Sequence, residues 1–186
     1  MSIKVLTLVG SLRGASVNRK LAEAAAAVAP EGTEVTLYEG LASVPFYNED
    51  LDVEGQVPAA AAALREAAGE ADAVLFVTPE YNGTTPAVLA NAIDWLSRPY
   101  GAGAVKDMPA AVVSASPSGF GAQWANDNTR KALGVAGAKV LEDVSITVGG
   151  RFEVFAETHP KDHAETAAEL AGVVSALASA LEPANA

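Results

Sequence analysis

Residues 73–96 read AVLFVTPEYNGTTPAVLANAIDWL, and this stretch decides the fold. Its first six residues form an apolar run of strand length. A short polar loop follows, stiffened by Pro79 and Pro86, and residues 87–96 then form an alanine- and leucine-rich helical segment. An apolar strand, a stiff polar loop and an apolar helix in direct succession predict one repeat unit of a parallel sheet.

The same alternation extends along the whole chain. We expect strands at 4–9, 34–38, 73–78, 110–114 and 139–147, and helices at 18–28, 58–68, 87–96, 122–133 and 165–181. Such alternation predicts an α/β fold with a parallel sheet covered on both faces. Asp162 and Glu165 resemble a capping box before the last helix. No repeat or linker divides the chain, so residues 1–186 should form one domain, with 182–186 as a frayed tail.

Composition restricts the possible functions. The chain has 186 residues, no cysteine and a net charge of −11. Without cysteine there is no disulfide, thiolate nucleophile or iron–sulfur site, so redox chemistry requires a bound cofactor. The acidic balance argues against a nucleic acid partner. No apolar run reaches the length of a membrane span, and the N-terminal run resembles a core strand more than a secretory signal, so we expect no membrane partner and a cytoplasmic location.

The loop GSLRGAS after the first strand is rich in hydrogen-bond donors. Its side-chain donors are Ser11, Arg13 and Ser16, and Asn18 follows at the start of the helix. Residues 1–22 carry two lysines and two arginines but no acidic residue. Hydroxyls, a guanidinium and a helix N-terminus together favour a terminal monophosphate. The alternative is that Ser16 only caps the helix and Arg13 is a solvated surface residue.

Two further loops follow the strands expected at 73–78 and 110–114, where open α/β sheets bind ligands. In the first of them, N–H groups of a turn with Asn and Gly could bind the pyrimidine edge of a flavin, beside the aromatic ring of Tyr81. The other supplies Ser116, Ser118, Gly119 and Gly121, and its glycines permit close backbone approach to a ligand. The alternatives are an ordinary turn before a core helix and a plain loop.

Together, these loops resemble the NADPH-dependent FMN reductase family of flavodoxin-like proteins, which includes quinone, chromate and azo-dye reductases. The matching segments are GSLRGASVNRKLA, PFYNEDL at 45–51 and TPEYNGTTPAVLANAIDWLSRP, within about residues 3–135. The resemblance implies a flavodoxin-like three-layer sandwich with a five-stranded parallel sheet in strand order 2-1-3-4-5. The third loop departs from the family pattern at Pro117 and Ala122.

The resemblance also implies ligands and roles. The FMN phosphate would be bound by Ser11, Arg13, Ser16 and Asn18. The ring and ribityl chain would contact Pro79, Glu80, Tyr81, Asn82 and Gly83, and the other side would be closed by Ser116 and Gly119. NADPH or NADH would donate hydride, and a quinone, chromate, an azo compound or free flavin would accept electrons in a ping-pong reaction. With aromatic residues in PFYNEDL and AIDWLSRPY, the resemblance further predicts a homodimer or homotetramer.

Other functions stay open at this point. The chain could be a flavodoxin-type electron carrier, or a flavin reductase that supplies reduced FMN to a monooxygenase. Arg13 and the PEYNG loop argue against the carrier, whose phosphate loop is typically a Thr/Ser-Gly-Asn-Thr run. His159 and His163 have the spacing of helical metal ligands, but Pro160 lies between them and no third ligand is nearby. We therefore expect helix-entry residues and no metal site.

Overall fold

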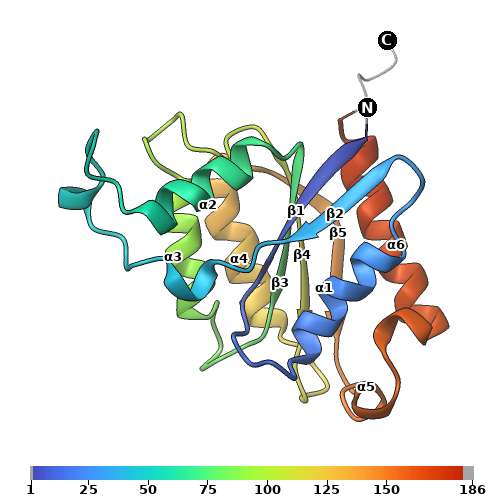
Figure 1. The fold of residues 1–186 in the computed structure, drawn as a ribbon. Coiled ribbons are helices and arrows are strands. Elements are labelled where there is room, and N and C mark those ends of the chain that lie inside the picture. Colours follow the sequence, from blue (N-terminus) through green and yellow to red (C-terminus); the bar gives the residue numbers. More distant parts are fainter. Residues whose placement is uncertain (1, 182–186) are drawn as a thin grey trace.

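A computed structural model describes residues 2–181, in which strands and helices alternate (Figure 1). The strands are β1 (Ile3–Val9), β2 (Thr33–Leu37), β3 (Ala73–Thr78), β4 (Pro109–Ala115) and β5 (Lys139–Val148). The α-helices are α1 (Val17–Ala27), α2 (Ala59–Gly69), α3 (Ala87–Leu96), α4 (Gln123–Val135), α5 (Val154–Glu157) and α6 (Ala164–Ser179). Short 3-10 turns are η1 (Leu41–Ser43), η2 (Glu49–Leu51) and η3 (Pro160–Asp162). The expected strands and five long helices are confirmed.

The five strands form one sheet in the order β2-β1-β3-β4-β5, and every neighbouring pair is parallel. The predicted strand order is therefore confirmed. Since β1, β3 and β4 are consecutive in space, the loops that follow them lie at the same edge of the sheet (Figure 1, lower edge). This is the carboxyl edge, where open parallel sheets bind ligands.

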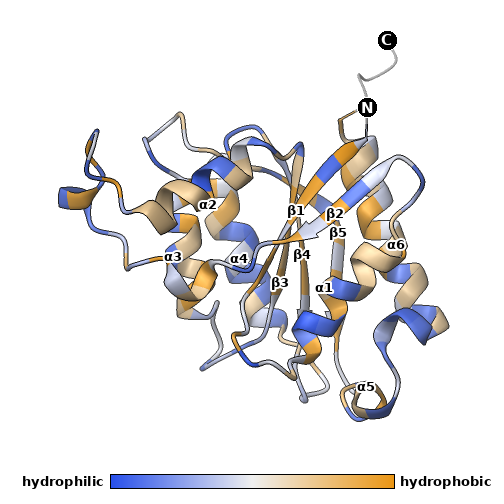
Figure 2. Cartoon of the chain, in the orientation of Figure 1, coloured by the Kyte–Doolittle hydropathy of each residue, from blue (hydrophilic) through white to orange (hydrophobic). Residues whose placement is uncertain are grey.

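Helices cover both faces of the sheet. α1 and α6 pack on one face, and α2, α3 and α4 pack on the other (Figure 1). The two cores contain large, fully buried side chains, among them Phe155 and Leu170 on the first face and Phe76 and Trp95 on the second. Every residue of β3 and β4 is buried, so these strands are almost continuously apolar, as Figure 2 shows for the central strands.

The edge strand β5 contains an irregularity. Its pairing with β4 shifts register between Ala110 and Val112. Arg130 of α4 covers this place, because its guanidinium donates to backbone carbonyl oxygens at 2.9–3.3 Å, those of Leu141, Glu142 and Val144. Three carbonyl groups of the irregular part of β5 are thereby hydrogen-bonded to a side chain.

The expected capping box at Asp162 and Glu165 is wrong. Asp162 belongs to η3, and the N-cap of α6 is His163, whose Nδ1 accepts the N–H of Thr166 at 3.4 Å. His159 likewise precedes η3 as its N-cap, so the interpretation of both histidines as helix-entry residues is confirmed.

The expected tail at 182–186 lies outside the described residues. Within residues 2–181, no helix is long and apolar enough to cross a membrane.

Candidate functional site

The loop between β1 and α1 runs close to the start of α3. Gly10 hydrogen-bonds through its N–H to the carbonyl of Val77, at 2.8 Å. A Cβ at Gly10 would lie 2.6 Å from Cδ1 of Leu89 and 2.8 Å from Cγ of Pro86. Only glycine fits at this position, because any side chain would collide with the start of α3. The first and second loops are therefore close neighbours.

The first loop offers backbone donors to solvent. No backbone N–H from Ser11 to Ala15 donates to a carbonyl group of the described residues, whereas Ser16 bonds back to Arg13. Ser16 is the N-cap of α1, and its Oγ accepts the N–H of Arg19 at 3.4 Å. Capping is thus one role of Ser16, while its own hydroxyl proton can still be donated. A row of N–H groups before a helix N-terminus is a ready anion site.

The basic residues near the N-terminus do not act together. Arg19 is ion-paired with Glu23 and Glu39, and its hydrogen bonds to Glu39 lower the pKa of that carboxyl group. Lys20 donates to the carbonyl of Phe155 at 2.7 Å. Lys4 is exposed near the opposite end of β1. Lys20 keeps its charge, because a carbonyl group is neutral, but the basic residue within the loop itself is Arg13, which is exposed and forms no ion pair within residues 2–181.

Asn18 joins the first and third loops. Its side chain is 2% exposed, and Nδ2 donates to the carbonyl of Ala115 at 3.2 Å. Because that carbonyl requires a donor, the amide orientation is fixed, and the buried Oδ1 has no partner within the described residues. The sequence did not indicate this contact with the end of β4. The role of Asn18 as a phosphate ligand stays a prediction.

The loop between β3 and α3 contains a tight turn. Tyr81 and Thr84 exchange backbone hydrogen bonds at 3.4 and 3.2 Å. Asn82 and Gly83 between them have φ values of 53° and 71°, the positive values that a type I′ turn requires and that Asn-Gly supplies. Tyr81 is 51% exposed, and the preceding Pro79 is buried. The N–H groups of Asn82 and Gly83 donate to no carbonyl of the described residues, so the turn presents donors.

The loop after β4 is tied down internally. Ser114 donates to the carbonyl of Gly121 at 2.8 Å, and the hydroxyls of Ser116 and Ser118 are 2.8 Å apart. Gly119 is exposed. A Cβ at Gly149 would collide with the carbonyl oxygen of Gly119, so the loop after β5 also lies against this site. This fourth loop was not predicted, although its Gly149-Gly150 pair was a signal in the sequence.

All eleven candidate residues lie on or directly after the three loops at the carboxyl ends of β1, β3 and β4 (Figure 1). Two aromatic residues that the sequence reasoning did not select join them. Phe120 is 83% exposed and Trp124 is 67% exposed. A Cβ at Gly83 would lie 3.1 Å from the ring of Trp124, so this ring is next to the turn. The edge of the site is therefore aromatic.

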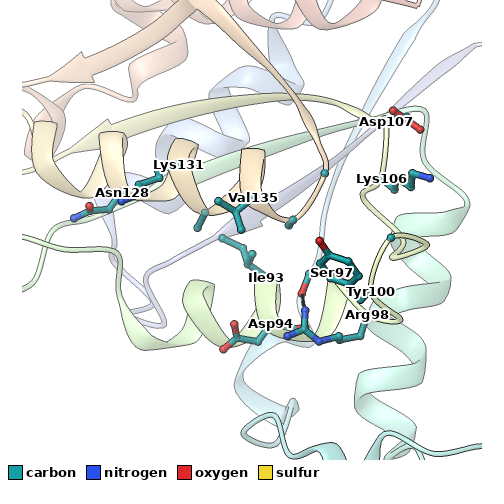
Figure 3. Close-up of a pocket in the computed structure, with 14 residues that line it drawn as sticks. Ile93, Asp94, Ser97, Arg98, Tyr100, Lys106, Asp107, Asn128, Lys131 and Val135 are labelled. Carbon is teal, nitrogen blue, oxygen red and sulfur yellow. Dashed lines mark hydrogen bonds between the residues drawn. The ribbon is translucent and has the colours of Figure 1, made fainter.

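A separate pocket of about 720 Å³ lies elsewhere (Figure 3). It is lined by the C-terminal halves of α3 and α4 and by the segment before β4, including Asp94, Arg98, Lys106 and Lys131. Burial raises the pKa of Asp94, against the opposing charge of Arg98. Since residues 106 and 107 precede β4, this end of the pocket is at the amino edge of the sheet. Its lining residue Asn128 also bonds to the carbonyl of Gly83 in the second loop, but the pocket is lined by none of the eleven candidate residues.

The donors of the three loops fit FMN. Free N–H groups, two hydroxyls and one guanidinium suit a phosphate monoester at the start of α1. The I′ turn with its outward N–H groups suits the polar edge of a planar ring. No group of three or more metal-ligating side chains occurs among residues 2–181.

A parallel 2-1-3-4-5 sheet with donor-rich loops after β1, β3 and β4 defines a flavodoxin-like nucleotide-binding protein. The chain belongs to the NADPH-dependent FMN reductase family, whose sequence pattern matches residues 3–153. It is therefore a flavin oxidoreductase that uses FMN and NAD(P)H.

Similar proteins agree with this assignment. A quinone reductase of Pseudomonas putida is 41% identical over 151 residues, which are 81% of this chain and 80% of the relative. An NAD(P)H-dependent FMN reductase of Pseudomonas aeruginosa is 41% identical over 131 residues, 70% and 69% of the two chains. The structure of FerB, a flavoenzyme NAD(P)H:(acceptor) oxidoreductase from Paracoccus denitrificans, superimposes with a TM-score of 0.83 at 34% identity and covers 95% of this chain and 96% of FerB.

Proposed function

We propose that this protein transfers hydride from NAD(P)H to FMN held by the three loops, and then electrons to a small acceptor such as a quinone, in a ping-pong reaction. The observation that carries the proposal is the convergence of unpaired N–H donors, hydroxyls and Arg13 at the carboxyl ends of β1, β3 and β4. Relatives named quinone reductase support the acceptor class.

In this proposal, the first loop binds the phosphate. The N–H groups of residues 11–15 and the hydroxyls of Ser11 and Ser16 donate hydrogen bonds, while Arg13 neutralises charge. Asn18 holds the start of α1 against the end of β4, so that the phosphate loop and the third loop keep a fixed separation. Ser116 and Gly119 form the far side of the site.

The second loop positions the ring. When bound, FMN itself supplies the acceptance and donation of hydride. Pro79 and Glu80 lead into the turn, Tyr81 lies beside the ring, and Asn82 and Gly83 direct N–H groups toward it. The carbonyl of Gly83 accepts a hydrogen bond from Asn128 at 3.3 Å, which holds this peptide group in one orientation. A loop stiffened by Pro79 and Pro86 favours a hydride-transferring enzyme over a one-electron carrier, in which a glycine peptide flips.

Anaerobic mixing of the purified protein with NADPH, followed at the flavin absorbance, tests the proposal. We expect complete bleaching with no partner protein and recovery of the absorbance when a quinone is added after NADP⁺ has been removed. Flavin that stays oxidised until a separate reductase is supplied would identify an electron carrier. Gel filtration before mixing separates the remaining alternative, because FMN used as a substrate for a monooxygenase partner would be lost from the protein.

We also propose a homodimer or homotetramer in the cytoplasm. Trp95 is fully buried within the chain and does not support this assembly, but Phe46 is 80% exposed and Tyr100 is 90% exposed. Large aromatic side chains at these exposures gain free energy when a second copy covers them. Sedimentation at micromolar concentration tests the assembly, and a single 18.9 kDa species would refute it.

A further inference from the structure

The N-terminus of α4 lacks a cap of its own. Its N-cap is Ala122, whose methyl group accepts no hydrogen bond and whose φ and ψ are 66° and 39°. Gln123 bonds back to the carbonyl of Phe120 at 3.2 Å, which satisfies only the first helical N–H. The next N–H groups of a helix normally receive an acceptor from the N-cap side chain. Here that acceptor must come from elsewhere in the fold.

Glu80 supplies the acceptor from the second loop. Its Oε2 accepts the N–H of Ala125 at 3.1 Å, although the two residues are 45 positions apart. Ala125 is the third residue of α4, the position that an N-cap side chain serves in an ordinary helix. The negative charge of a carboxylate is also favourable at the positive end of the helix dipole. Glu80 therefore caps α4 from a different loop.

The other end of the same loop is also docked on α4. Nδ2 of Asn128 donates to the carbonyl of Gly83 at 3.3 Å and lies 3.4 Å from Oγ1 of Thr84. The hydroxyls of Thr85 and Thr129 are 2.9 Å apart. The Tyr81–Thr84 turn is thus held between two attachments, Glu80 before it and Asn128 after it. α4 therefore fixes the position of this turn relative to the sheet.

We infer that Glu80 is a positioning residue, which fixes the turn of residues 81–84 against α4 so that the turn's N–H groups are oriented before FMN arrives. The inference rests on the proposed function. It gives Glu80 a role other than the ring contact implied by the family resemblance, because one carboxylate oxygen is directed to the helix. A loop that is already ordered loses less conformational entropy on binding, so this attachment increases affinity.

Three variants test this inference. Glu80→Ala removes the acceptor, and Glu80→Gln retains a side-chain oxygen without the charge. His163→Ala is the matched control, because it removes an equivalent capping bond, to Thr166 at 3.4 Å, from α6 on the opposite face of the sheet. Amide hydrogen exchange is measured on the FMN-free proteins, and FMN affinity is measured by fluorescence titration of each variant.

In Glu80→Ala, amide exchange of Ala125 and of the turn should accelerate in the FMN-free protein, and FMN should bind roughly five- to tenfold more weakly, the factor that corresponds to one lost cap. Glu80→Gln should restore most of the protection from amide exchange and most of the FMN affinity. His163→Ala should accelerate exchange at Thr166 and leave FMN affinity unchanged.

Two results would overturn the inference. If Glu80→Ala accelerates exchange at Ala125 alone and binds FMN as the unmodified protein does, Glu80 is only a helix cap. If Glu80→Gln binds FMN as weakly as Glu80→Ala while its FMN-free exchange is normal, Glu80 contacts the cofactor directly. Failure of the unmodified protein to bind FMN would instead refute the proposed function, and the exchange data would still report whether Glu80 orders the turn.

Discussion

Arg13→Ala should weaken FMN binding without weakening riboflavin binding. Arg19 is ion-paired with Glu23 and Glu39, the ammonium of Lys20 donates to the carbonyl of Phe155, and Lys4 lies at the opposite end of β1. Arg13 is the basic residue of the first loop itself, and it is free to bind a phosphate because it forms no ion pair within residues 2–181. One charge-assisted hydrogen bond to a phosphate contributes about 1.5–3 kcal/mol, which corresponds to roughly a ten- to hundredfold change in the dissociation constant. Riboflavin has the same ring and no phosphate, so its affinity should stay constant.

The assay is fluorescence titration of both flavins against three proteins. Lys4→Ala is the matched control, because it removes the same charge from the amino end of the strand that leads to the loop. Its FMN affinity should equal that of the unmodified protein, and added salt should reduce the effect of Arg13→Ala. Equal losses for FMN and riboflavin, or unchanged FMN affinity in a folded Arg13→Ala protein, would show that Arg13 is a solvated surface residue.

Three further changes test interactions that hold the fold together. Asp52→Asn should lower the free energy of unfolding by about 1–3 kcal/mol at neutral pH, because Arg65 donates to both carboxylate oxygens at 2.6 and 2.7 Å. That hydrogen bonding lowers the pKa of Asp52, so the contribution of the Asp52–Arg65 pair to the free energy of unfolding is complete above the ordinary Asp pKa and is lost as the pH falls through the lowered value. In urea titrations, the difference in unfolding free energy between Asp52→Asn and the unmodified protein should therefore shrink in acid. A difference that stays constant with pH would show that the pair is not the cause. Ala122→Gly should stabilise the protein by roughly 0.5–1 kcal/mol, since a methyl group is strained at a φ of 66°, and a lower thermal midpoint would be inconsistent with strain. Trp95→Phe should cost about 1–2 kcal/mol in denaturant titrations, because the indole N–H donates to the carbonyl of Pro45 at 2.8 Å in a buried position, whereas an unchanged midpoint would mean that another donor replaces it.

The regular elements could be predicted because their signals are local. β3 is buried at every residue and is apolar up to its last residue, Thr78, and the long helices show their periodicity within one segment. The segment between β2 and α2 carries no such signal. It is held by distant side chains, since Asn91 accepts the N–H of Tyr47 and donates to the carbonyl of Val44. Side chains that reach across 44 or more residues leave no pattern in a short window.

The location of the candidate site was predictable, but its internal connections were not. Loops that follow parallel strands lie at one edge of the sheet, so the three candidate loops after β1, β3 and β4 could be predicted to lie together. The family resemblance implied that Asn18 and Glu80 contact FMN, which stays a prediction. It did not indicate that Asn18 bonds to the carbonyl of Ala115 at the end of β4, or that Glu80 accepts the N–H of Ala125 in α4. Likewise, the clustered charges of the N-terminal segment indicated a positive field that the pairing of Arg19 with Glu23 and Glu39 weakens.

The guanidinium of Arg130 at the irregular part of β5 has a consequence for self-association. An outermost strand with a regular row of unused N–H and C=O groups is a template onto which another chain can add, the first step toward fibrils or swapped dimers. In this protein, three carbonyl groups of the outermost strand are engaged by a side chain from the protein's own helix, and the register shift interrupts the row beside them. The ten-residue strand therefore lacks a continuous edge for such growth, so its aggregation tendency is lower than its length alone would suggest.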